Sequence, residues 1–250
     1  MTAALQARAI QFAFLGALLV AWFAIGRTGA ISPLFLPPME AVAAALVRLV
    51  QTAEFWSAVG TTLTTIIEAY LIAAVLGILA GWLVTRSRFL TRVLEPIVSG
   101  LFAIPITLFF PVFILMFGIG PESKVAYGAA YGFFPIALNT IAGLIGVDDR
   151  YLSAARSLGV SGFGLFRHVL FPAAFPVILT GLRIGFFICF ASVLGGETIS
   201  SVSGVGRNIA LAAELMEPAR MYAWIAFVIV AALVLNALVC TRKPHAEPLR

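Results

Sequence analysis

The sequence predicts an all-α, polytopic membrane protein with about six transmembrane helices. Hydrophobic residues make up 62% of the 250 residues and charged residues only 11%, whereas a typical soluble domain is about 25% charged. Six apolar runs approach or exceed the roughly 20 residues that cross a bilayer as helix. Four are uncharged, 9–26, 96–121, 125–147 and 221–241, and two carry one charge each, 61–85 with Glu68 and 173–196 with Arg183. We treat residues 1–250 as a single transmembrane domain.

The N-terminal run, 9–26, follows Arg8 and could be mistaken for a secretory signal. No small-x-small cleavage site precedes the polar turn after it, and further apolar runs follow, so we predict a retained helix. The next segment, 27–60, is expected on the outer face. Apolar residues recur at helical spacing within it, which predicts a surface helix over 38–51. That helix is either a contact platform for a delivery protein or an interfacial brace.

The run 61–85 carries Glu68, the one acid well inside a predicted span. Counted from Thr61 at roughly 1.5 Å per residue, it lies about 10 Å below the outer boundary. An intramembrane carboxylate is costly to bury unless it is paired, so it is a functional candidate by default. We expect Glu68 to face an aqueous vestibule, with structural pairing as the close alternative.

The runs 96–121 and 125–147 contain prolines, each of which frees the backbone carbonyl four residues earlier from helical hydrogen bonding. Such carbonyls need hydroxyls, water or solute as partners in lipid, so we expect both spans to line a cavity. Thr107 and Asn139 lie near the middles of the two runs and are pathway candidates. Asn139 either bonds a neighbouring helix, which is favoured, or contacts solute. The prolines are Pro105, Pro111 and Pro135.

Small residues at four-residue spacing recur within the predicted spans and predict close approach of helix backbones. Such pairs indicate packing rather than a binding site. They are Gly77 with Gly81, Gly128 with Gly132, and Gly181 with Gly185.

A polar segment, 148–172, separates two of the apolar runs. Asp148 and Asp149 can cap a helix whose first turn favours acidic groups, and Gly159 can end that helix in a left-handed conformation. One short helix is therefore expected over 150–158. Taken alone, this pattern also fits an ordinary amphipathic helix at the membrane surface.

A second outer segment, 198–220, is longer than a turn requires and is rich in serine and glycine. A short helix is expected over 208–216. The glycines permit a tight re-entry toward the pathway, so this segment is a candidate outer gate. Its candidate residues are Glu197, Gly204 and Gly206.

Basic residues determine the orientation. With the N-terminus inside, the inner face carries ten basic and four acidic residues, and the outer face five and six. The positive-inside rule therefore puts both termini and segment 148–172 in the cytoplasm. The inner residues are Arg8, Arg86, Arg88, Arg92, Arg150, Arg156, Arg167, Arg242, Lys243 and Arg250 against Glu95, Asp148, Asp149 and Glu247. The outer residues are Arg27, Arg48, Lys124, Arg207 and Arg220 against Glu40, Glu54, Glu122, Glu197, Glu214 and Glu217.

Several function classes are excluded by what the sequence lacks. The net charge of +5 is dispersed at membrane edges, so nucleic-acid binding is not indicated. The sequence contains no phosphate loop and no nucleophile elbow. His168 and His245 have no spaced metal-binding partners, and Cys189 and Cys240 give no disulfide framework. We expect no catalytic residue, no metal and no cofactor in this chain, so any energy source is a separate partner.

Within 148–172, the residues Ser153, Ala154 and Ala155 precede Gly159 by three residues, and nine more residues precede a Val-Leu-Phe-Pro sequence at 169–172. This spacing resembles the cytoplasmic docking loop of ATP-binding-cassette importer permeases, whose pattern is Glu-Ala-Ala, three residues, Gly, nine residues, Ile-x-Leu-Pro. Ser153 replaces the motif Glu. The resemblance implies that the ATPase contacts are Ser153, Ala154, Ala155, Arg156, Gly159, Val169 and Pro172.

Further landmarks resemble the nitrate, sulfonate and taurine type of permease. They are Leu36 with Pro37 and Pro38, Phe117 to Gly120 with Ser123 and Lys124, Gly181 with Arg183, and Glu197 followed by Gly204, Val205 and Gly206. Thr65 departs from the family, which has an Arg in the second span.

The resemblance implies a type I importer in a bacterial inner membrane. Its expected partners are a second permease, identical or paralogous, an ATPase dimer that uses ATP and Mg²⁺, and an extracytoplasmic binding protein. The solute is expected to be small and anionic, although Glu68 on the pathway weakens an assignment of nitrate or sulfonate.

Two other function classes are compatible with the apolar spans. One is a stand-alone secondary transporter or channel that uses Glu68 as a proton or cation site, and the other is a membrane scaffold without transport. Neither accounts for the three-residue and nine-residue spacings of the motif in 148–172, or for the predicted cytoplasmic location of that segment. We therefore interpret the chain as a permease subunit, and copurification of an ATPase discriminates among the three.

Overall fold

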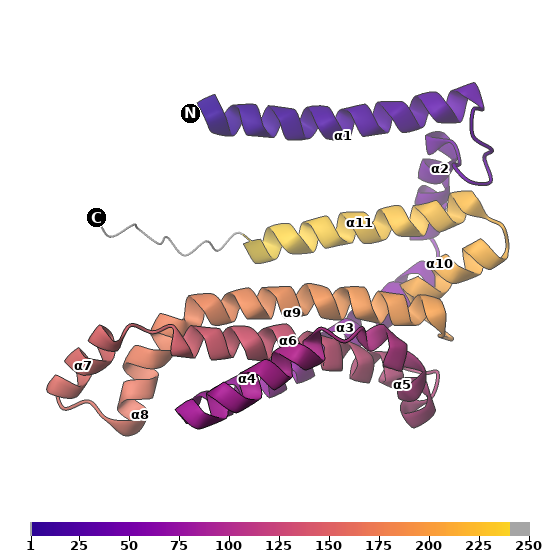
Figure 1. The fold of residues 1–250 in the computed structure, drawn as a ribbon. Coiled ribbons are helices and arrows are strands. Elements are labelled where there is room, and N and C mark those ends of the chain that lie inside the picture. Colours follow the sequence, from indigo (N-terminus) through magenta and orange to yellow (C-terminus); the bar gives the residue numbers. More distant parts are fainter. Residues whose placement is uncertain (1, 241–250) are drawn as a thin grey trace.

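The computed structural model describes residues 2–240, and every regular element within them is a helix (Figure 1). The α-helices are α1 (Thr2–Thr28), α2 (Met39–Val50), α3 (Ala53–Thr85), α4 (Arg88–Phe102), α5 (Phe110–Phe117), α6 (Pro121–Ile145), α7 (Asp149–Ser157), α8 (Gly162–Leu165), α9 (Phe171–Ile199), α10 (Val205–Glu214) and α11 (Pro218–Cys240). A 3₁₀ turn, η1 (Ile106–Phe109), precedes α5, and a π-helical turn, η2 (Phe166–Leu170), precedes α9. The predicted all-α class is confirmed. Arg242, Lys243, His245, Glu247 and Arg250 lie outside the described residues.

Within the described residues, five helices are long and apolar enough to cross a membrane, and a bent pair supplies a sixth span. The five spans lie in α1, α3, α6, α9 and α11, and the sixth joins α4 to η1 and α5 across a 75° bend. The predicted number agrees, but the run 96–121 is not one continuous helix. Pro105 has no N–H to donate and disfavours a helix through its predecessor, so the chain breaks at 103–105.

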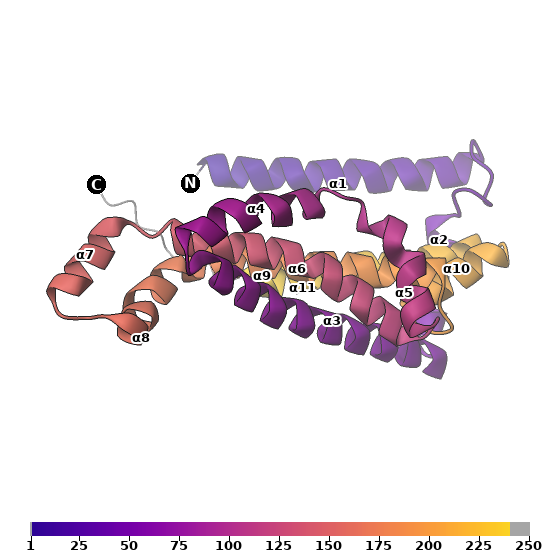
Figure 2. The same cartoon turned by 60° about the horizontal axis from the view of Figure 1, so that its bottom comes forward.

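Helix α6 packs against both α3 and α9 in the centre of the bundle (Figure 2). A Cβ on Gly81 of α3 would lie 2.6 Å from the Cβ of Thr140 in α6. On the other side, a Cβ on Gly181 of α9 would lie 2.5 Å from the Cβ of Asn139. These glycines allow the backbones to approach closely, as predicted.

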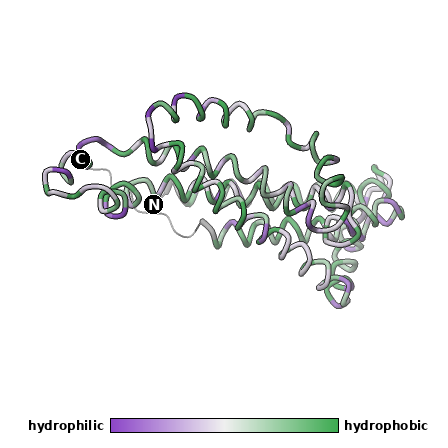
Figure 3. The backbone as a smooth tube through the Cα atoms, turned by 90° about the horizontal axis from the view of Figure 1, so that it is seen from below, coloured by the Kyte–Doolittle hydropathy of each residue, from purple (hydrophilic) through white to green (hydrophobic). Residues whose placement is uncertain are grey.

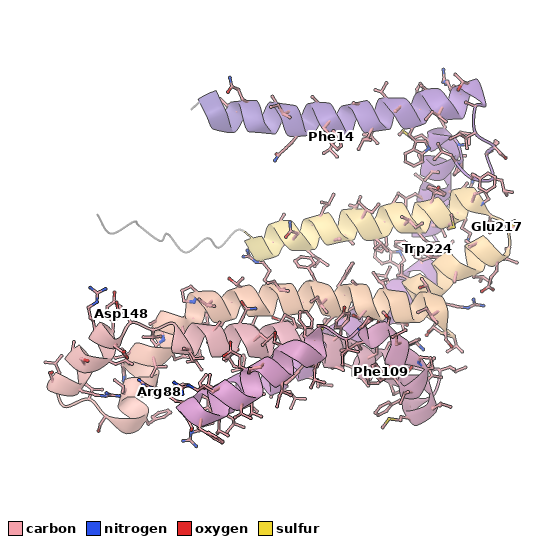
Figure 4. All side chains as sticks on the ribbon, viewed as in Figure 1. Phe14, Arg88, Phe109, Asp148, Glu217 and Trp224 are labelled. Carbon is pink, nitrogen blue, oxygen red and sulfur yellow. The ribbon has the colours of Figure 1, made fainter. Side chains whose placement is uncertain are left out.

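The connecting elements gather at two opposite ends of the bundle. α7, α8, the start of α4 and the end of α11 lie at one end, which we call the hairpin end (Figure 1). α2, α5, α10 and the start of α11 lie at the other, the α10 end. Figure 3 shows hydrophilic residues concentrated toward these ends and apolar residues along the spans. In Figure 4, Arg88 and Asp148 mark the hairpin end, and Glu217 and Trp224 mark the α10 end.

The predicted surface helix 38–51 is present as α2, and its apolar face is covered. Val42, Ala45 and Leu49 are buried in a cluster with residues of α3 and α11. In that cluster the Phe55 and Trp224 rings stack with centroids 5.1 Å apart. These contacts make α2 a brace between spans rather than a helix that rests on lipid alone.

Two element boundaries differ from prediction. Helix α3 begins at Ala53, so the outer segment 27–60 includes the first turns of a span. Helix α10 begins at Val205 rather than 208. The early start of α10 is due to tertiary contacts, because its first backbone N–H groups bond to side chains of other helices.

Candidate functional site

The segment 148–172 forms a helical hairpin at the hairpin end of the molecule (Figure 4). Asp148 caps α7, since its Oδ1 accepts a hydrogen bond from the Arg150 backbone N–H at 2.9 Å. Its Oδ2 accepts a second bond from the Arg150 guanidinium Nη2 at 2.6 Å. The Arg150 side chain thereby holds the pKa of the Asp148 carboxyl below its usual value, and Asp148 raises the pKa of the Arg150 guanidinium. The predicted cap is confirmed.

Helix α7 ends as expected at Gly159, whose φ is +80°. The Gly159 N–H donates to the Arg156 carbonyl at 2.9 Å, and the Val160 N–H donates to the Ala155 carbonyl at 3.0 Å. This pair of bonds is the Schellman motif, which requires a left-handed residue just after the helix. A Cβ on Gly159 would meet no atom within 4 Å. Glycine is therefore favoured here by its positive φ alone and not by lack of space.

One of the predicted docking residues is buried in the single chain. Ala155 is only 7% exposed, because α7 folds back onto η2 and covers it. Ser153, Ala154 and Arg156 are exposed on the other side of α7. The small side chain that a partner can reach on this helix is therefore Ala154.

The second half of the motif leads directly into a span. Val169 is partly buried within η2, and Pro172 is exposed in the first turn of α9. Pro172 has no backbone N–H, so it donates no hydrogen bond back to the turn that precedes it. The hairpin is thus joined to α9 through a π-helical turn, an element found frequently at functional sites.

A buried carboxylate lies at the α10 end. Glu197, in the last turns of α9, is 2% exposed. The Thr62 hydroxyl of α3 lies 2.9 Å from both of its carboxylate oxygens, and the Gly206 backbone N–H donates to its Oε2 at 2.9 Å. The Thr62 hydroxyl in turn accepts a bond from the Val205 N–H at 2.8 Å. The structure therefore brings Glu197, Thr62 and the start of α10 together.

Both candidate glycines pack directly against this carboxylate. Gly204 has a φ of +105°, and a Cβ there would overlap the carboxyl group of Glu197. A Cβ on Gly206 would lie 2.6 Å from the Glu197 Cβ and 2.5 Å from the Leu194 carbonyl oxygen. Glu197, Gly204 and Gly206 therefore form one contiguous cluster.

Lys124 is a buried member of the same end, whereas the sequence placed it among surface charges. It is 0% exposed, and its Nζ donates to the carbonyls of Ile119 at 2.6 Å and Gly120 at 3.1 Å. Its stem packs beside Gly196, whose added Cβ would lie 3.2 Å from the Lys124 Cγ. Its burial could have been suspected from the sequence, because Lys124 is the one lysine between the apolar runs 96–121 and 125–147. Thr62 gave no comparable signal, since hydroxyls in spans usually bond their own helix.

Glu68 lies apart from the buried cluster, in an open groove of about 810 Å³ bounded by α3, α5 and α6. Glu68 and Glu122 are both exposed on its walls, and no lysine or arginine lines it among the described residues. Thr64 and Thr65 add hydroxyl groups, and Phe117 and Phe133 add aromatic rings. The arrangement fits the expectation that Glu68 faces water.

The two mid-span candidates do not share a site. Thr107 is exposed within η1, and its carbonyl, predicted to be free, accepts the Phe110 N–H. Asn139 donates from Nδ2 to the Pro135 carbonyl of its own helix at 2.8 Å, and its Cβ packs against Gly181 of α9. The favoured helix-to-helix hydrogen bond of Asn139 is thus replaced by a bond within α6 and a packing contact with α9.

Comparisons with known proteins agree with this architecture. Residues 73–241 match the family described as binding-protein-dependent transport system inner membrane component. The chain is 31% identical over 227 residues to the taurine transport system permease protein of Escherichia coli, across 89% of this chain and 82% of that protein. It is 30% identical over 204 residues to an aliphatic sulfonates transport permease protein of Bacillus subtilis, across 82% and 74%.

A solved structure of the MetNI methionine ABC transporter, in inward-facing conformations, has a similar fold. Its matching chain superimposes with a TM-score of 0.55 at 18% sequence identity. The match covers 80% of this chain and 97% of that chain.

Proposed function

This chain belongs to the binding-protein-dependent inner-membrane permeases, of the taurine and sulfonate type, and we propose that it forms the solute pathway of an ATP-driven importer. The single observation that carries the proposal is the 148–172 hairpin. It is capped at Asp148, its first helix ends at Gly159, and it enters α9 at Pro172. Its sequence has the spacing of a docking loop, which supports the proposal.

Coupling runs through this hairpin in the proposed mechanism. ATP is hydrolysed, with Mg²⁺, by a separate ATPase subunit that lies against the exposed face of α7 in the cytoplasm. Ser153, Ala154 and Arg156 present a low, cationic surface for that contact. Because η2 leads without a break into α9, a displacement of the hairpin is transmitted to a span that carries Glu197 at its far end.

A second permease, identical or paralogous, completes the pathway. The groove beside Glu68 is open along one side of the bundle in a single chain. Placed against a second permease, it becomes an enclosed route between the two faces. A binding protein delivers the solute at the α10 end, which faces outward when the hairpin faces the cytoplasm.

The solute we propose is a small organic anion that also carries an ammonium group. A relative at 31% identity is named for taurine, an amino sulfonate. Glu68 and Glu122 would repel a simple anion but attract an ammonium group, whereas the aromatic walls accommodate the carbon chain. An amino sulfonate therefore fits this groove better than an alkyl sulfonate without nitrogen.

The test is uptake by the complete complex in proteoliposomes. The permease is coexpressed with its ATPase, reconstituted with the binding protein outside, and supplied with labelled taurine or labelled ethanesulfonate. We expect uptake of taurine that needs both ATP and the binding protein, and less uptake of ethanesulfonate. Uptake that proceeds without any ATPase would instead identify a secondary transporter or channel that uses Glu68.

A further inference from the structure

The buried carboxylate of Glu197 serves α10 in the way that an N-cap side chain serves its own helix. The first backbone N–H groups of a helix have no partner within it. Gly204, at the N-cap position of α10, has no side chain to offer. Instead Glu197 of α9 accepts the Gly206 N–H, and Thr62 of α3 accepts the Val205 N–H. Two other helices therefore cap α10.

A single hydroxyl joins the three helices. Thr62 accepts a bond from Val205 and donates to Glu197, so its oxygen lies between α10 and α9. Loss of that hydroxyl removes one bond to each helix at once. The carboxylate would then keep only the Gly206 N–H among the bonds described for it.

The rest of α10 is held by packing. Its buried residues are Val205, Gly206 and Ala212, and Ile209 is partly buried against the cluster that joins α2, α3 and α11. The Arg207 and Glu214 side chains bond to each other on the exposed side of the helix. The polar contacts of its first turn therefore join α10 to α3 and α9, and the packing of Ile209 and Ala212 holds its later turns.

The turn between α5 and α6 is fastened to the same place. Lys124 holds the Ile119 and Gly120 carbonyls of this turn while its stem packs beside Gly196, the residue before Glu197. The positive charge of Lys124 also acts on the Glu197 carboxylate through space. Both outer turns, 118–120 and 200–204, thus meet at the last turns of α9.

We propose that Glu197 and Thr62 are positioning residues that latch α10 over the outer end of the pathway, and that the latch opens during each transport cycle. This inference rests on the proposed importer function. Hydrogen bonds to a buried carboxylate suit a latch, because they hold firmly when dry and exchange for water when the outer end opens. Gly204 has a positive φ, and because glycine adopts positive and negative φ about equally, the backbone before α10 can change direction at this residue.

The first test compares threonine variants in the full complex in lipid, with ATP hydrolysis measured without and with binding protein. Thr62→Val keeps the shape and removes a hydroxyl that bonds both α9 and α10. Hydrolysis without binding protein should therefore rise by at least the roughly fivefold population shift expected from one net hydrogen bond. Thr62→Ser should restore the low basal rate. Thr61→Val is the matched control, because the Thr61 hydroxyl bonds only the Ser57 carbonyl of its own helix.

A merely structural role has a different signature. It would lower permease abundance, hydrolysis and taurine uptake in equal proportion, without raising the basal rate. That outcome, or a wild-type basal rate in Thr62→Val at normal abundance, would overturn the latch. A wild-type complex that shows no ATP-dependent uptake would instead overturn the importer function itself.

A disulfide provides a second test that does not depend on a weakened fold. Thr62→Cys with Val205→Cys, in a background without the two native cysteines, introduces thiols on two neighbouring residues. The Val205 backbone N–H bonds the Thr62 hydroxyl at 2.8 Å, and both side chains line the same small cavity. Oxidation should stop taurine uptake while the ATPase stays bound, and reduction should restore uptake. Full uptake by the oxidised protein would show that α10 does not need to leave this position, and would refute the latch.

Discussion

Two glycines of this chain are required for different physical reasons. Gly159 has a φ of +80° in open space, so a side chain there is resisted by the backbone angle alone. Gly206 has no such angle, but an added Cβ would lie 2.5 Å from the Leu194 carbonyl oxygen. Substitution at the first position strains a cap, whereas substitution at the second forces two helices apart.

The cap predicts a local effect at the hairpin. Gly159→Ala should cost roughly 1 kcal/mol in the stability of the end of α7 and reduce the ATPase copurified per permease. The control is Gly164→Ala, whose added Cβ makes only an ordinary contact of 3.5 Å with Val160. Hydrogen exchange across α7 measures the first effect, and equal protection in both variants would contradict it.

The exposed face of α7 predicts a second effect. Ala154→Glu should leave the hairpin folded, since the side chain points away from the chain, yet lower ATPase association because it adds bulk and an acidic group at the contact. Ser153→Ala should change little, because the motif carboxylate is already absent at that position. Ala155→Glu places a carboxylate on the buried face of α7, where it packs on η2, and should disturb the fold of the hairpin. Copurified ATPase at matched abundance separates the three, and full association in Ala154→Glu would exclude this face.

At the scale of elements, α3, α6 and α9 pack together in the centre of the bundle, and the other helices pack around them. Close backbone approach replaces large side chains in this centre, as the Gly81 and Gly181 contacts show. Association of helices in lipid relies on such packing, because lipid supplies no hydrophobic force between them. The α4–α5 pair lies outside this centre, and its 75° bend packs on α6 through Ile106 and Phe110, which are buried in a cluster with Tyr127.

A matched pair of glycine variants tests the packing. Gly81→Ala would place a Cβ 2.6 Å from the Thr140 Cβ, and such overpacking should cost roughly 1–3 kcal/mol. Gly100→Ala in α4 meets nothing within 4 Å and should be neutral or slightly stabilising. Thermal unfolding in detergent, followed by helical circular dichroism, compares them. Equal midpoints would mean that the α3–α6 contact is looser than the structure indicates.

For the whole molecule, apolar runs and turn chemistry predicted the number of spans and the first helix of the hairpin, whereas α8 and η2 were not predicted. Asp148 and Gly159 act through neighbouring backbone, which a sequence reveals directly. The break before η1 was missed because Pro105 can either kink a helix or end it, and neighbouring helices decide which. The burial of Ala155 depends on how α7 folds onto η2, and that of Lys124 depends on α9, an element far along the chain. The Thr62–Glu197 bond joins residues 135 positions apart, so no local pattern discloses it.

The two-ended architecture predicts a labelling pattern. In a variant without Cys189 and Cys240, single cysteines at Arg88 and Ser157 should react with an impermeant reagent only from the cytoplasmic side. Cysteines at Gln51 and Met216 should react only from outside. All four positions are exposed in the chain. Reaction of Ser157→Cys from outside would invert the orientation and remove the importer interpretation.

Coupling through the hairpin is the central claim, and site-specific cross-linking tests it most directly. A photoreactive residue is placed at Ala154, or at Met216 as the matched exposed position on the other end, in a complex that hydrolyses ATP in response to binding protein. We predict that the residue at Ala154 captures the ATPase subunit and that the residue at Met216 does not. Absence of capture at Ala154 in that active complex, or capture at Met216, would contradict the account.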